Sequence, residues 1–79
     1  MNFTTTRRQV ADNVELARRV RGMSKRALAA GLHITEGTLR TRQHCTTAFT
    51  TDELGALGEI LEVDPGEFFS SSFASSLAA

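Results

Sequence analysis

Apolar residues recur at helical spacing along most of the 79-residue chain. The first such run consists of Val10, Val14, Ala17 and Val20. It predicts a helix from Arg7 to about Arg21, because residues three and four apart share one helical face. Thr6 is a suitable N-cap for this helix, and Gly22 is a suitable end. Residues 1–6 show no apolar period, so we expect a flexible N-terminal arm there.

Two short helices joined by a tight turn are predicted over residues 24–44. Ser24 is a suitable N-cap for the first helix, and Gly31 can adopt the positive φ that ends it. Thr35 is the N-cap of the second helix, which covers residues 36–44. The apolar residues expected to face the core are Leu28, Ala29, Leu32, Ile34 and Leu39.

A fourth helix is predicted after a polar loop that Phe49 anchors to the core. Thr50 or Thr51 caps this helix. The acids Asp52 and Glu53 follow in its first turn, where the helix dipole favours negative charge. The residues expected to be buried are Leu54, Leu57, Ile60 and Leu61.

Gly55 and Gly58 lie inside this fourth helix, where each costs about 1 kcal/mol relative to alanine. We interpret both as places where another backbone passes closely. The alternative is that both are tolerated losses.

A short fifth helix follows, with Asp64 as its cap and Pro65 as its first residue. Phe68 and Phe69 are expected to close the core. Five helices without a strand predict a compact all-α bundle, with its domain over residues 7–69.

The tail, residues 70–79, is serine-rich and low in complexity, so we expect either disorder or a short helix. A helix would carry one apolar stripe of Phe69, Phe73 and Leu77, which would invite a second copy if exposed. The final Leu77-Ala78-Ala79 resembles the end of the bacterial degradation tag read by the Clp protease, which implies recognition by that protease.

The net charge is zero, but the charges are unevenly distributed. Residues 1–45 hold all nine Lys and Arg against three acids, a net charge of +6. Residues 46–79 hold six acids and no Lys or Arg, a net charge of −6. This asymmetry favours a nucleic-acid partner for the basic half, with the acidic half facing away. The alternative is that the two halves attract each other within the fold.

Composition also points to a cytoplasmic protein. The single cysteine, Cys45, cannot form an internal disulfide and fits a reducing compartment. The N-terminus lacks the apolar core of a signal peptide, and no run of about 18 apolar residues exists, so we expect no membrane association.

The exposed face of the second helix in the two-helix motif consists of Gly37, Arg40, Thr41 and His44. Such a helix, with Leu39 inward, is suited to the DNA major groove. Arg40 is the main candidate, because its guanidinium can donate two hydrogen bonds to guanine O6 and N7. Thr38 and Thr41 either touch a thymine methyl or a phosphate, or are simply surface. Glu36 either accepts from cytosine N4 or only favours the helix N-terminus electrostatically.

The expected phosphate contacts are Arg7, Arg8, Lys25, Arg26 and His44. His33 is expected instead to pack or cap within the turn. The set His33, His44 and Cys45 lacks metal-site spacing, so we predict no metal and no cofactor. No nucleophile, base and orienting group stand in a recognisable arrangement, so we predict no catalytic residue and no enzyme.

Several short stretches carry a family resemblance over Val10 to Phe69. They are Gly22-Met23-Ser24, Leu28-Ala29, Ile34-Thr35, Leu39 and the closing run LGEILEVDPGEFF from Leu57. Together they resemble the Cro/CI-type (XRE-type) helix-turn-helix domain of phage and bacterial repressors. The resemblance implies the lambda-repressor-like five-helix bundle. It also implies base-reading positions at Thr35, Glu36, Gly37, Arg40 and Thr41, with Lys25 at a phosphate.

The chain departs from the family pattern at several positions. His33 occupies the position of the usual turn glycine, and Cys45 follows the second helix where another glycine is usual. Arg42 replaces an apolar residue, so it must snorkel or pair with an acid such as Glu15 or Glu53. Gln43 replaces the glutamate that often pairs with the first-helix arginine, Arg18, so that bond would be weaker.

The resemblance implies a transcriptional regulator, most simply a Cro-like repressor. It would bind a near-palindromic double-stranded DNA operator as a homodimer, at least on DNA, with its third helix in the major groove. Dimer contacts would come from the fifth helix, the tail or DNA-assisted pairing. The alternative is a protein-interaction module, such as an antitoxin or anti-repressor subunit, that binds through its acidic half or its tail.

Overall fold

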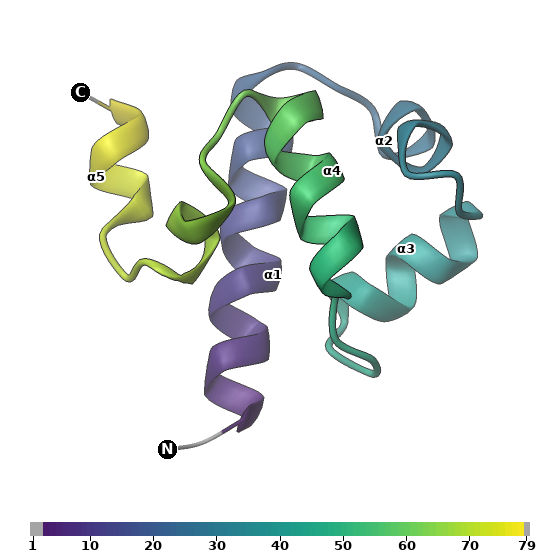
Figure 1. Ribbon diagram of the computed structural model, residues 1–79, viewed down its shortest axis with the longest axis horizontal. Helices are drawn as coiled ribbons and strands as arrows, with labels where there is room; N and C mark the ends of the chain where they lie inside the picture. Colours follow the sequence, from purple (N-terminus) through teal and green to yellow (C-terminus); the bar gives the residue numbers. More distant parts are fainter. Residues whose placement is uncertain (1–2, 79) are drawn as a thin grey trace.

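The longest helix, α1 (Phe3–Val20), runs through the middle of the molecule, with α2 and α3 on one side and α5 on the other (Figure 1). The elements that follow α1 are α2 (Lys25–Gly31), α3 (Glu36–Gln43), α4 (Thr51–Leu61), the 3-10 helix η1 (Pro65–Phe69) and α5 (Phe73–Ala78). The computed structural model describes residues 3–78, and within them helices are joined by turns and irregular loops, with no strand. The predicted all-α helical bundle is confirmed. None of the helices in these residues is long and apolar enough to cross a membrane.

The core combines one apolar stripe from each helix. Its buried members include Val10, Val14, Ala17, Leu28, Leu39, Leu54, Leu57, Leu61, Phe68 and Phe73. Met23, Ile34, Phe49 and Ile60 are half-buried against this cluster. Helical spacing therefore predicted most of the core correctly.

One buried polar residue, Asn13, was not foreseen. Its side chain donates to the carbonyl oxygens of Phe68 and Ser70, both at 2.8 Å, and accepts from Gln9 at 3.2 Å. These bonds satisfy the amide, which is 5% exposed. Asn13 thereby ties α1 to the segment that joins η1 to α5.

The predicted arm is wrong for the residues from Phe3 onward, because α1 begins there. Residues 1–2 of that arm lie outside the described residues. Thr6, expected as the N-cap, is half-buried inside the helix and lines an apolar hollow with Val10 and Phe49.

The predicted closure of the core is right for Phe68 and wrong for Phe69. Phe68 is fully buried, whereas Phe69 is 53% exposed. Successive residues of a 3-10 helix point about 120° apart, so only one of the two rings can face inward. Phe73 takes the second place, with its ring centroid 5.9 Å from that of Phe68.

The tail is therefore helical over α5 and joined to the core through Phe73. The apolar stripe expected along it does not form as predicted, because Phe73 is buried while Phe69 is exposed. Of the predicted protease signal, Leu77-Ala78-Ala79, the last residue lies outside the described residues.

Three helices end in the same hydrogen-bonded turn, in which the residue after the cap adopts a positive φ. That residue is Gly22 after α1, His33 after α2 and Cys45 after α3. The family's glycine positions thus keep their left-handed backbone although His33 (φ 58°) and Cys45 (φ 62°) carry side chains. Gly31, expected to end α2, remains helical. An added Cβ there would lie 3.0 Å from Ile60 Cδ1, so Gly31 serves the contact with α4.

Close backbone approach is confirmed for Gly58 and wrong for Gly55. A Cβ at Gly58 would lie 2.7 Å from the carbonyl oxygen of Val63 and 2.7 Å from the ring of Pro65. A Cβ at Gly55 would meet nothing within 4 Å. After α4 the chain reverses direction, and residues 63–65 pass directly over Gly58. A side chain at residue 58 would occupy the space that these residues fill.

The two glycines of α4 should therefore respond to alanine in opposite directions. We expect Gly58→Ala to destabilise the fold by about 1–3 kcal/mol through overpacking. Gly55→Ala should stabilise it by about 0.5–1 kcal/mol, because alanine favours the helix and open space receives the methyl group. Urea unfolding of both variants measures the two changes. Equal effects would contradict the close approach at Gly58.

Candidate nucleic-acid interface

The orientation of α3 is set first by its cap and its one buried side chain. The hydroxyl of Thr35 accepts the backbone N–H of Thr38 at 3.0 Å, which starts the helix. Leu39 is 1% exposed and packs in the core. The opposite face of α3 therefore points away from the protein.

A polar contact on one side joins α3 to α4. Arg42 meets both carboxylate oxygens of Glu53, at 3.0 and 3.2 Å, and donates to the hydroxyl of Thr47 at 2.6 Å. The Arg42 and Glu53 side chains are only 18% and 13% exposed. Arg42 therefore pairs with an acid, as predicted, and Glu53 is the acid it uses.

The same pair controls the ionisation of Glu53. Burial alone would raise the pKa of this carboxyl, but hydrogen bonds from Arg42 and from the backbone N–H of Thr50 outweigh burial, so the pKa is lowered. Glu53 is also the third residue of a capping box with Thr50. One carboxylate thus starts α4 and holds α3 against it.

A second polar contact joins α3 to α1. Gln43 donates to Glu15 at 2.8 Å, and Glu15 also accepts from Arg18 and Arg19. Hydrogen bonding from Arg18 is the main reason that the pKa of Glu15 is lowered. The direct bond between Arg18 and Gln43 considered from the sequence is wrong, because Glu15 lies between them.

The outward face of α3 bears most of the predicted base-contacting residues. Thr35, Glu36, Gly37, Arg40 and Thr41 are exposed, and Thr38 is half-buried. The threonine hydroxyls are partly engaged: Thr35 donates to Thr38 Oγ1 at 2.9 Å, and Thr41 donates to the carbonyl oxygen of Thr38 at 2.7 Å. The side chains of Glu36 and Arg40 form no hydrogen bond or ion pair with any other residue in 3–78. Their charged groups therefore remain available to a ligand.

Two hollows bring predicted residues from different elements together. The first is lined by Lys25, Glu36, Leu39, Arg40, Gln43 and His44. The second is lined by Arg8, Ala11, Asp12, Glu15, Arg19, Lys25, Gln43 and His44. Lys25 and His44 border both, so the start of α2, the end of α3 and one face of α1 form one continuous surface.

The second hollow also contains a residue that the sequence reading missed, Arg19. Its side chain is 71% exposed and is held 3.1 Å from Glu15. Arg19 lies eleven residues after Arg8, about three helical turns, so the two share a face of α1. That spacing could have identified it.

The remaining phosphate candidates lie elsewhere or are partly engaged. Arg7 lines a separate apolar hollow, and Arg26, although exposed, lines neither hollow beside Lys25. Arg8 lies 3.7 Å from Asp12 and donates a long bond of 3.5 Å to the carbonyl oxygen of Gln43. Fewer basic side chains therefore line the two hollows than the nine Lys and Arg of the basic half would suggest.

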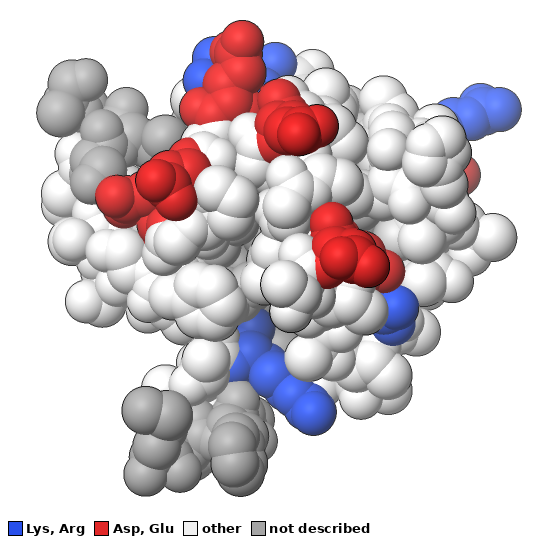
Figure 2. Space-filling view, in the orientation of Figure 1, with Lys and Arg blue, Asp and Glu red and all other residues white. Residues whose placement is uncertain are grey.

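The acids of the second half are largely separated from this surface. Figure 2 shows a face on which acidic residues gather, with Lys and Arg at its margin. None of the acids of residues 46–79 lines the two hollows around Lys25. Two of them do pair with the basic half, Glu53 with Arg42 and Glu62 with Arg21 at 3.0 Å. The attraction between the two halves that was considered as the alternative therefore occurs at these two ion pairs.

Comparison with known families finds that a model described as the Cro/C1-type HTH DNA-binding domain matches residues 15–73. No curated protein and no solved structure matches the chain. The matched segment includes the whole of α2, α3, α4 and η1. In residues 3–78, no three His, Cys, Asp or Glu side chains are grouped to hold a metal ion.

The ion pair between Arg42 and Glu53 should make stability depend on pH. Glu53→Gln keeps an acceptor for the capping box and removes the charge, and we expect it to cost about 1–3 kcal/mol at pH 7. Because the folded-state pKa of Glu53 lies below the ordinary 4.5, the contribution of the pair is present above that value and is lost as the pH falls through the lowered pKa. The difference between parent and variant should therefore shrink below about pH 4.5.

Urea unfolding between pH 2.5 and pH 7, at roughly half-unit steps, measures this difference. Glu59→Gln is the matched control, because Glu59 is exposed on the same helix and should change stability by less than about 0.5 kcal/mol. A cost for Glu53→Gln that does not vary with pH would contradict the role of the ion pair.

Proposed function

The chain belongs to the Cro/C1-type HTH DNA-binding domain family, and from that premise we propose that it is a sequence-specific transcriptional regulator. In this proposal it is a Cro-like repressor that places α3 in the major groove of a near-palindromic double-stranded DNA operator. The observation that carries the proposal is the outward face of α3. It presents Arg40 and Glu36 without protein partners in residues 3–78, beside Lys25, on a helix secured to both α1 and α4.

Base recognition in this proposal centres on Arg40. Its guanidinium donates to guanine O6 and N7, a contact worth about 1–3 kcal/mol of discrimination. Glu36, one helical turn earlier, accepts from a cytosine N4. Thr38 and Thr41 offer methyl groups to thymine. The hydroxyl of Thr35 accepts the N–H of Thr38 and so caps α3, which places Thr35 at the end of the helix that contacts the bases.

Phosphate contacts in this proposal come from the residues around the two hollows. Lys25 and His44 border both, and Arg8 and Arg19 extend the surface along α1. Arg7 and Arg26 contribute from outside the hollows. These contacts supply affinity that does not depend on sequence and falls with salt.

Alanine substitutions at Arg40 and at Lys25 should change DNA binding in different ways. Arg40→Ala should reduce discrimination at one base pair by about 5- to 150-fold, because a bidentate base contact is lost. Lys25→Ala should weaken binding to all sequences alike and reduce the salt slope by about 0.9, because one phosphate contact is lost. Selection from a random duplex pool, followed by gel-shift titration at several salt concentrations, measures both effects.

Arg21→Gln is the matched control for loss of one positive charge. Arg21 pairs with Glu62 and is absent from both hollows, so its loss should leave the selected sequence unchanged. If the parent chain prefers no duplex over random DNA at moderate salt, the proposal fails. Recovery of a stoichiometric protein partner in its place would favour the interaction-module alternative.

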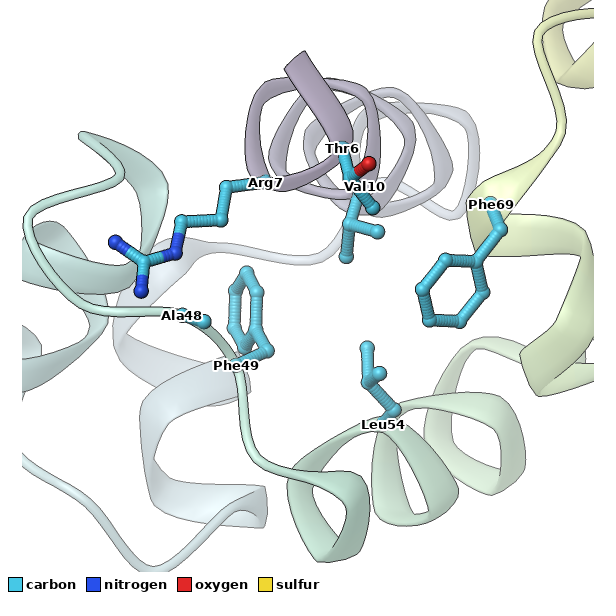
Figure 3. A pocket seen from close by; sticks show the side chains of 7 residues that line it. All are labelled: Thr6, Arg7, Val10, Ala48, Phe49, Leu54 and Phe69. Atoms are coloured by element: carbon cyan, nitrogen blue, oxygen red, sulfur yellow. The ribbon is translucent and has the colours of Figure 1, made fainter. Parts of the chain in front are cut away.

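We further propose that the chain binds its operator as a homodimer through the surface around Phe69. Phe69 is a large apolar residue, 53% exposed, at the edge of an apolar hollow. Figure 3 shows Phe49 and Phe69 on opposite sides of this hollow, with Val10 and Leu54 also lining it. A two-fold axis would let the ring of each copy enter the hollow of the other.

Phe69→Ser should therefore weaken dimer formation by about tenfold or more, measured by sedimentation and by the cooperativity of half-site binding. Val20→Ser is the matched control, since Val20 is equally exposed, at 57%, but does not line this hollow. Both residues are exposed, so neither change should unfold the chain. An unchanged dimer in Phe69→Ser would refute the assignment of this surface.

A further inference from the structure

Within residues 3–78, four hydrogen bonds from three side chains converge on the carboxylate of Glu15 in α1. Arg18 donates to both of its oxygens, with Nε 3.1 Å from Oε2. Arg19 donates to Oε1 at 3.1 Å, and Gln43 of α3 donates to Oε2 at 2.8 Å. An amide at this position would offer only one oxygen, and its NH2 group would face other donors. The arrangement therefore requires a carboxylate.

These donors reach three parts of the proposed DNA-binding surface. Arg18 also donates to the carbonyl oxygen of Met23 at 2.7 Å, in the turn that leads into α2. Gln43 is on α3 and lines both hollows beside Lys25. Arg19, whose side chain is 71% exposed, lines the second hollow and is a proposed phosphate contact. One carboxylate thus links α1, the start of α2 and α3.

Electrostatics alone would disfavour an acid at this place. Glu15 lines the second hollow together with cations that are proposed to contact phosphates. A carboxylate beside phosphates is repelled by them, so neutralising it should strengthen binding to any duplex. Asp12 is a matched acid in the same hollow, 62% exposed, whose ion pair with Arg8 at 3.7 Å stays within α1. Asp12 therefore supplies the same charge without a hydrogen bond to α3 within residues 3–78.

We propose that Glu15 is a positioning residue for base recognition, which sets the rotation of α3 through Gln43 and the direction of Arg19 with the same carboxylate. This inference rests on the proposed function and extends it from the residues that touch DNA to one that acts through them. The bond between α1 and α3 should also form with the two residue types exchanged. Arg18 Nε and Gln43 Nε2 contact the same oxygen of Glu15, so a carboxylate on α3 would still lie beside Arg18 and would accept from an amide on α1.

The first experiment compares Glu15→Gln with Asp12→Asn in the full chain, at a temperature at which circular dichroism shows each variant folded. Affinity is measured for the operator selected by the parent chain and for random duplex of equal length. Glu15→Gln should lower the ratio of operator to random affinity by about fivefold or more, because α3 loses its hydrogen bond to α1. Its affinity for random duplex should not fall. Asp12→Asn should raise both affinities equally and keep the ratio, because it removes a charge and no contact with α3.

The second experiment exchanges the two residue types, which keeps the net charge of the parent chain. Gln43→Glu alone should also lower the ratio, because two carboxylates would then meet where Gln43 and Glu15 are now 2.8 Å apart. Glu15→Gln combined with Gln43→Glu should recover most of the parent ratio, because a carboxylate and an amide again face each other. A residue that only stabilises the fold would not give this reciprocal rescue, since the ratio is measured on folded chains.

Hydrogen exchange of the α3 amides, measured without DNA, separates this inference from the function on which it rests. Exchange should quicken by about tenfold in Glu15→Gln, stay the same in Asp12→Asn and recover in the double variant. A parent chain that selects no sequence would refute the proposed function, and α3 exchange would still decide whether Glu15 holds that helix. A parent that selects a sequence, with the same ratio in Glu15→Gln or no recovery in the double variant, would refute the positioning role alone.

Discussion

The structure of this domain depends on how α3 is held, and three contacts hold it. Leu39 packs into the core beneath the helix, Arg42 reaches Glu53 on α4, and Gln43 reaches Glu15 on α1. An apolar contact alone would leave α3 free to rotate about its axis, since hydrophobic burial is non-directional. The two polar contacts lie on adjacent residues and extend to different helices, so together they determine the rotation. The outward direction of Arg40 follows from that constraint.

The departures from the family pattern are compensated in the backbone and in neighbouring side chains. His33 and Cys45 replace glycines, yet each occupies the left-handed position of a turn whose two backbone hydrogen bonds are intact. The apolar side chain that follows His33, Ile34, packs against the core and supports the same turn. At the other departure, Gln43 has lost the family's carboxylate, and Glu15 on α1 supplies one instead.

Sequence periodicity predicted the helices well, because the buried face of a helix places apolar residues three or four positions apart, and this spacing is visible in one sequence. It could not choose between Phe68 and Phe69, because both are apolar and adjacent. Which of the two faces inward depends on how the five-residue 3-10 helix is placed against the core. It also missed Asn13, because an asparagine in an apolar stripe looks like an error until its partners are known. Those partners are carbonyl groups more than fifty residues away. The site residues on α3 were predicted from one helix face, and the spacing of Arg8 and Arg19 on α1 could have identified Arg19 in the same way. The position of Lys25 between the two hollows depends on how α1, α2 and α3 pack, which periodicity within one helix does not reveal.

The zero net charge has a physical consequence for a DNA-binding protein. Glu53 and Glu62 neutralise Arg42 and Arg21, and Glu15 and Asp12 lie beside Arg19 and Arg8, so few cations are left unpaired near α3. Non-specific affinity rises with the number of phosphates neutralised, so a chain with few free cations binds random DNA weakly. The acidic face would also be repelled by phosphates, which disfavours docking with α3 turned away. Under the proposed function, base contacts on α3 and pairing of two copies therefore supply a larger share of the free energy of recognition than charge does.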